Sequence, residues 1–248
     1  MSLEGLDISI LGPAFIAGLL VLTTHVPLGQ EVLKRGIIFI DLAIAQVAGL
    51  GVIVAFYFGW EMHGWEVQVA AMLSAISAAL ILSIMEKYWA HVHEALIGVI
   101  FILAATASIL LLAENPQGGE HLKELLIGQI LWITWEQLIP VALISAIVLI
   151  IWFKFKHLFG HSGFYLLFAL AVTSSVQLVG IYLVFASLII PALGSMRYNR
   201  KKSLFLGYII GALGYATGLM LSSLMDLPSG AVIVWSIAAI ALLSKIIR

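Results

Sequence analysis

Long apolar runs recur along the whole chain, and they constrain its fold more than any other feature. Runs of about 20 apolar residues, each long enough to cross a hydrocarbon core of about 30 Å as a helix, follow one another from near the start to the end. Of the 248 residues, 62% are hydrophobic and 10% are charged, whereas soluble domains carry about 25% charged residues. We therefore predict an all-α polytopic transmembrane helix bundle that occupies residues 1–248 as one domain.

The apolar runs define the expected membrane spans. Those that are clear from length and composition are Ile8–Leu28, Gly36–Gly59, Val67–Met85, Ala95–Ala113, Gln137–Phe155, Ser203–Leu224 and Ala231–Ile247. The stretch Leu158–Met196 gives eight spans if it is one long helix. It gives nine if two passes meet near Ser174, Ser175 and Gln177. The connection Glu114–Glu136 is expected to hold a short surface or re-entrant helix.

Basic residues decide between these two counts. Lys and Arg residues that flank spans collect on the cytoplasmic side of a membrane. With nine spans and an external N-terminus, eleven of the 12 Lys and Arg residues face the cytoplasm, and Lys123 is the exception. With eight spans the same residues divide seven to five. We therefore expect nine spans, an external N-terminus and a cytoplasmic C-terminus.

The composition excludes several classes of function. A net charge of −1 without a long Lys/Arg-rich segment gives no electrostatic footprint for nucleic acid. The chain has no cysteine, so any metal must be held by His, carboxylate, amide or backbone oxygen. No Walker-type glycine loop, HExxH or nucleophile motif occurs, so we expect a protein that is not an enzyme and has no ATPase site of its own.

Polar residues inside the apolar runs are the candidates for function, because an ionisable residue in a span costs about 2.5 to 3.5 kcal/mol on insertion scales. Asp41 lies in the run GIIFIDLAIAQVAGLG, with Gln46 further along, and the small residues around them permit close helix packing. His25 lies near the inner end of the first span, where a neutral imidazole can ligate zinc. These three residues are candidates for transient contact with a passing cation. The alternative is that each one is paired with a neighbouring polar group for structure.

A second group of possible ligands lies in WAHVHEALIG at the expected inner mouth. His91, His93 and Glu94 form an HxHE cluster there. Residues two apart on a helix point in different directions, so chelation by both histidines needs a non-helical local backbone. The cluster is a weaker metal candidate, and the alternative is an ordinary polar loop end.

Ordered segments in the chain carry a family resemblance. VQLVGIYLVFASLIIPALGSMR (Val176–Arg197) is followed, after one span, by LMDLPSGAVIV (Leu224–Val234). Upstream lie HEALIGVIFILAATASILLL (His93–Leu112) and ELLIGQILWITWEQL (Glu124–Leu138). In these segments the chain resembles the permease (integral membrane) subunits of bacterial zinc, manganese and iron ABC importers.

The resemblance implies a permease subunit of an ATP-driven importer for a divalent transition metal, with a pathway that opens by alternating access. Zinc is the expected cargo, with manganese or iron as further options, and no cofactor is bound permanently. The implied location is the bacterial plasma (inner) membrane. The implied partners are a second permease copy in a homodimer, cytoplasmic ABC ATPase subunits and an extracytoplasmic metal-binding protein.

The chain departs from the family in two places. The second span of the family usually carries an aspartate and a histidine one helical turn apart, but here Asp41 is followed by Ala45. Coordination at Asp41 is therefore in doubt, and Gln46 or His25 are candidates to substitute. The longer cytoplasmic stretch that contacts the ATPase in the family is reduced here to KFKHLFGHSG. The candidates for ATPase coupling are then the basic residues Lys154, Lys156, Arg197, Arg200, Lys201 and Lys202.

Two other functions fit an apolar helical chain less well. A secondary cation transporter or channel that uses Asp41 predicts internal repeats and discontinuous helices in matching halves, and no convincing repeat occurs. A membrane-embedded enzyme needs several converging acid, base or metal-binding residues inside the membrane. Asp41 is the single ionisable residue that the sequence places unambiguously inside a span. We rank the enzyme last.

Overall fold

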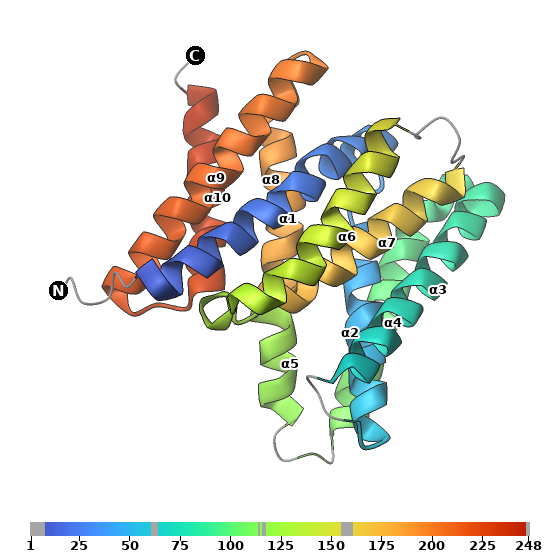
Figure 1. The fold of residues 1–248 in the computed structure, drawn as a ribbon. Helices are drawn as coiled ribbons and strands as arrows, with labels where there is room; N and C mark the ends of the chain where they lie inside the picture. Colours follow the sequence, from blue (N-terminus) through green and yellow to red (C-terminus); the bar gives the residue numbers. More distant parts are fainter. Residues whose placement is uncertain (1–7, 61–63, 114, 116–117, 155–160, 247–248) are drawn as a thin grey trace.

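The computed structural model describes residues 8–60, 64–113, 115, 118–154 and 161–246. These residues form helices and connecting turns without any β-strand, which confirms the all-α prediction (Figure 1). The α-helices are α1 (Ile8–Arg35), α2 (Ile40–Tyr57), α3 (Trp65–Trp89), α4 (His93–Leu112), α5 (Gly118–Ile127), α6 (Trp135–Lys154), α7 (His161–Val179), α8 (Ile181–Ser195), α9 (Arg200–Met225) and α10 (Ser229–Ile246). Two 3-10 turns, η2 (Ala90–Val92) and η3 (Ile130–Trp132), join α3 to α4 and α5 to α6.

The long helices agree with a membrane-spanning protein. In the described part of the chain, six helical segments are long and apolar enough to cross a membrane, and α8 and the apolar part of α10 are shorter. One of the six is the 48-residue segment Trp65–Leu112, which contains both α3 and α4 and is long enough for two crossings at 1.5 Å per residue. The ten-residue α5 is the short helix expected after Glu114.

The stretch between 158 and 196 is divided into α7 and α8, so its interpretation as one long helix is wrong. The division falls at Gly180, three residues after Gln177 and slightly later than the sequence suggested. Ser174 lies within α7, where its hydroxyl donates to the Leu170 carbonyl at 2.9 Å and is thereby satisfied inside the helix.

Gly180 ends α7 because of its backbone conformation and its neighbour. Its φ is 81°, a left-handed value that glycine adopts without steric cost. A β-carbon at Gly180 would overlap the backbone of Gly128. Gly128 has a φ of 73°, and a β-carbon there would in turn overlap the backbone of Val179 and Gly180. The turn after α5 and the turn between α7 and α8 are therefore packed backbone against backbone.

Helix α9 is held between α1 and α10 by glycines on its faces. The α1 side chains Leu22 and Val26 lie on the α9 glycines Gly211 and Gly207. One turn further along, the glycine is on α1 instead, and Tyr215 of α9 lies on Gly18. The residue numbers in all three pairs have the same sum, as expected for antiparallel helices in register. Small residues at these points let the two backbones approach closely.

The remaining helices form a second group beside this one. Helix α2 packs against α3 and α4, and α7 lies against α3, α2 and α6. Figure 1 shows α2, α3 and α4 on one side of the bundle, α8, α9 and α10 on the other, and α1, α6 and α7 across the middle. Helix α5 contacts α8, α4 and α7 and so joins the two groups.

Candidate functional site

Gln46 faces a groove between the two groups of helices. The groove has a volume of about 500 Å³ and is lined by α2, α4, α5, α8 and α10. Its walls are mostly apolar, and the Gln46 amide and the half-exposed Tyr182 on α8 are the polar side chains among its lining residues. Leu42, one turn before Gln46, lines it as well. The groove therefore has an amide group in a mostly apolar wall.

Asp41 is fully buried but does not line this groove. Asp41 and Gln46 are five positions apart, and at this spacing two side chains point about 140° apart around a helix. Within the described residues, neither carboxylate oxygen has a hydrogen-bond partner. Asp41 lies in the first turn of α2, where the helix dipole favours a negative charge. The structure thus separates the two residues that the sequence put forward together, and it places Asp41 at a helix end.

His25 is buried in α1 with one ring nitrogen engaged. Its Nδ1 lies 2.9 Å from the Val21 carbonyl oxygen. The Thr24 hydroxyl lies 3.0 Å from the same Nδ1. In the tautomer with the hydrogen on Nδ1, that nitrogen donates to the Val21 carbonyl and Nε2 carries a lone pair. Nε2 is buried and has no hydrogen-bond partner among the described residues. This tautomer of His25 can ligate a metal ion through Nε2, but no group of three possible ligands assembles around it in the described part of the chain.

The HxHE cluster holds helix ends in place. The buried His93 donates through Nε2 to the Leu82 carbonyl of α3 at 3.0 Å. Oε1 of Glu94 accepts the Phe39 N–H, at the start of α2, at 3.1 Å, and His91 is exposed. In the part of the chain that the structure describes, no three His, Asp or Glu side chains could hold one metal ion. The predicted cluster is therefore not assembled as a chelating group, because its members bond to separate backbone groups.

The basic candidates for ATPase coupling gather at one end of the bundle. Lys154 ends α6, Arg197 lies in the turn before α9, and Arg200, Lys201 and Lys202 form the first turn of α9. All five are exposed, whereas Lys156 lies outside the described residues. We call this end, which also holds Lys34 and Arg35 at the end of α1, the basic end.

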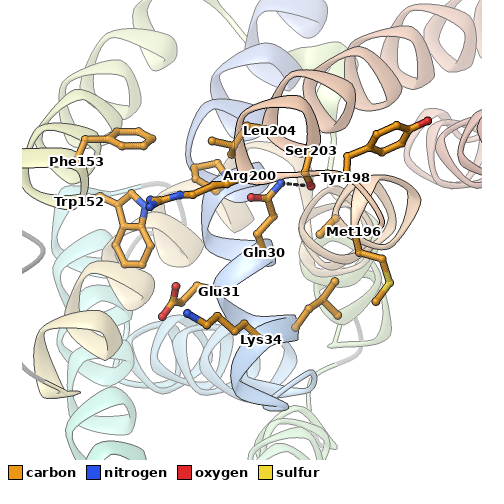
Figure 2. Close-up of a pocket in the computed structure, with 13 residues that line it drawn as sticks. Gln30, Glu31, Lys34, Trp152, Phe153, Met196, Tyr198, Arg200, Ser203 and Leu204 are labelled. Carbon is orange, nitrogen blue, oxygen red and sulfur yellow. Dashed lines mark hydrogen bonds between the residues drawn. The ribbon is translucent and has the colours of Figure 1, made fainter.

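A pocket of about 440 Å³ opens at the basic end between α1, α6 and the α8–α9 turn. Figure 2 shows Arg200 extending across it toward Trp152 of α6, with Lys34 on the opposite wall. Gln30 of α1 donates to the Ser203 hydroxyl of α9 at 2.8 Å. Sequence reasoning missed this pocket, because helices far apart along the chain supply its walls. In the sequence, the pocket was signalled by the basic residues at the end of α1 and at the start of α9.

Long apolar helices with a basic end are the features of a multi-pass membrane protein. The chain belongs to the ABC 3 transport family, whose model matches residues 7–164 and 155–248. This confirms the resemblance to bacterial metal ABC permeases. The two matched pieces overlap at residues 155–164, the stretch that follows α6 in the sequence.

Named relatives and a solved structure agree with this family. The chain is 26% identical to the manganese transport system membrane protein MntC of Listeria innocua, covering 94% of this chain and 89% of that protein. It is 25% identical to the "Probable iron transport system membrane protein" of Haemophilus influenzae, covering 94% and 91%. The structure titled PsaBC from Streptococcus pneumoniae in complex with Fab shares the fold, with a TM-score of 0.78, 24% identity and coverage of 98% of this chain and 95% of that chain.

Proposed function

We propose that this chain is the membrane-spanning subunit of an ATP-driven importer for a divalent transition metal in the bacterial plasma membrane. The observation that carries the proposal is the match of a transport family to almost the whole chain, whose described residues form a bundle of apolar helices. The whole chain acts as one permease domain and carries no ATPase site, so ATP is hydrolysed by cytoplasmic partner subunits. The N-terminus is external and the C-terminus cytoplasmic.

The groove beside Gln46 supplies one wall of the metal pathway in this proposal. A second copy of the chain faces it in a homodimer, and an extracytoplasmic metal-binding protein delivers the ion. Residues that hold the ion only briefly are suited to transport, because a ligand shifts a two-state equilibrium only through unequal affinity for the two states. Gln46 contacts the ion in the groove, and Asp41 and His25 offer the buried oxygen and nitrogen donors on either side of the α1–α2 turn.

The cargo is assigned from donor chemistry and from the names of the relatives. The sequence favoured zinc, but the relatives described above are named for manganese and iron. Carboxylate and amide oxygens such as those of Asp41 and Gln46 suit manganese, whereas imidazole suits zinc. The family histidine that would favour zinc is replaced here by Ala45. We therefore place manganese first and retain iron and zinc as competitors.

Contact with the ATPase is assigned to the basic residues at and near the basic end. Lys154, Arg197, Lys201 and Lys202 are exposed there, and Lys156 follows Lys154 in the sequence. Their charge fits an acidic surface on the partner. His91, His93 and Glu94 lie at the inner end of the pathway, where Glu94 fixes the start of α2 through Phe39.

Uptake of radioactive manganese, zinc and iron by cells that express the chain with its ATPase and binding protein tests this function. We expect manganese to accumulate in an ATP-dependent manner and Gln46→Leu or Asp41→Ala to lower uptake by about tenfold or more, as for groups that support a metal site. Gln68→Leu on the exposed face of α3 is the matched control and leaves uptake unchanged. Uptake that continues without the ATPase would instead identify a secondary transporter or channel.

A further inference from the structure

The pocket at the basic end has two kinds of wall. Lys34 and Arg200 bring positive charge, and Gln30, Ser203 and Tyr198 bring hydrogen-bonding groups. The other side is apolar, and it includes the buried Trp152 together with Phe153 and Met196, which are 54% and 60% exposed. A pocket of this composition fits a molecule with an anionic head and an apolar tail.

The charge balance of the pocket favours an anion. Glu31 also lines the pocket, but its carboxylate pairs with Arg35 at 3.2 Å. Because Arg35 counters the charge of Glu31, the pocket and its immediate surroundings keep an excess of positive charge, which Lys34 and Arg200 supply. Lys154 and Arg197 lie next to lining residues in sequence and add to the positive potential.

The position of the pocket favours a lipid over a free ion. It opens where spans end and apolar side chains meet basic ones, at the depth of the phospholipid head groups. Basic pockets between transmembrane helices on the cytoplasmic side bind anionic lipid head groups. Phe153 and Met196 would otherwise present apolar surface at the mouth of a polar pocket.

We propose that this pocket binds one anionic phospholipid. Lys34 and Arg200 hold its phosphate, the polar groups of Gln30, Ser203 and Tyr198 face its head group, and its acyl chain lies over Phe153 and Met196. Arg200 is thereby separated from Lys201 and Lys202, which line a different pocket with Phe205. The proposal rests on the membrane setting of the chain and on the proposed cytoplasmic position of the basic end, and not on the transport function.

Native mass spectrometry of the detergent-purified protein with added dioleoyl-phosphatidylglycerol or dioleoyl-phosphatidylcholine tests the proposal. The wild type is expected to retain one phosphatidylglycerol in preference to phosphatidylcholine. Lys34→Gln and Arg200→Gln each weaken that retention about fivefold, since a basic residue near the membrane surface contributes on the order of 1 kcal/mol. Lys87→Gln, at the end of α3 and outside the pocket, is the matched control and retains the lipid.

Variants that preserve the positive charge distinguish a loss of lipid binding from a loss of folding. Lys34→Arg and Arg200→Lys are expected to bind phosphatidylglycerol as the wild type does, and all variants should unfold at the same temperature in phosphatidylcholine. Equal retention of the two lipids, or full competition by inorganic phosphate, would overturn the proposal. It would also be overturned if Lys34→Gln and Arg200→Gln lost the ATPase subunit but kept phosphatidylglycerol, since the pocket would then belong to the protein contact.

Discussion

Around α9, the large side chains Leu22 and Val26 of α1 lie on glycines, whereas at the start of α2 the Asp41 carboxylate is buried with no hydrogen-bond partner among the described residues. The first arrangement fills space and stabilises the fold, because close packing gains dispersion energy. The second is unfavourable for stability, because a buried polar group without a hydrogen-bond partner is costly. The comparison separates a closely packed scaffold from a helix start whose buried carboxyl group does not stabilise the fold.

The largest expected effect tests the scaffold at Gly180. In Gly180→Ala, a left-handed backbone costs about 1–3 kcal/mol for a residue other than glycine, and the new methyl group overlaps the Gly128 backbone. We expect a loss of about 3 kcal/mol or more, seen as lower folded yield and a lower unfolding temperature in detergent. Gly98→Ala is the control, because the space around Gly98 is open. Equal unfolding temperatures for the two variants would show that the Gly128–Gly180 contact is not needed.

A smaller effect is expected between α1 and α9. The methyl group of Gly211→Ala overlaps the end of the Leu22 side chain, which can move, so we expect a loss of about 1–3 kcal/mol. The double variant Gly211→Ala, Leu22→Ala should be more stable than the sum of the two single losses predicts. Thermal unfolding of the four proteins gives this coupling energy, and strict additivity would mean that the two residues do not touch.

The smallest expected change in stability has the opposite sign. Asp41→Asn replaces a buried carboxyl group, whose ionised form is costly to bury, by a neutral amide of similar shape, so the unfolding temperature should stay the same or rise, by the equivalent of about 1 kcal/mol. Metal uptake should fall in the same variant, because stability and activity conflict at functional sites. A clear loss of stability would show instead that Asp41 supports the fold, and it would move Asp41 to the scaffold side of the comparison.

The fold class and most spans could be predicted because a membrane span is a matter of length and apolarity, both of which are read directly from sequence. The break between α7 and α8 was misplaced because Ser174, Ser175 and Gln177 stand out as polar. The actual break depends on the backbone angle of Gly180 and on its contact with Gly128. That contact joins residues 52 positions apart, and no local pattern reports it.

The candidate site was predictable residue by residue but not as an arrangement. Asp41 and Gln46 are both buried, as their place in an apolar run indicated. Their five-residue spacing already implied different directions on a helix. The bonds of His93 to Leu82 and of Glu94 to Phe39 depend on how three helices meet, which the sequence does not encode locally.

The register between α1 and α9 also sets the order in which the protein can be assembled. Helix α1 is synthesised first, and α9 follows about 165 residues later. Until then, Leu22 and Val26 face acyl chains, a surrounding as apolar as the glycine-lined surface that later receives them. In a bilayer, unlike in water, α1 therefore exposes no surface that favours aggregation before α9 is synthesised.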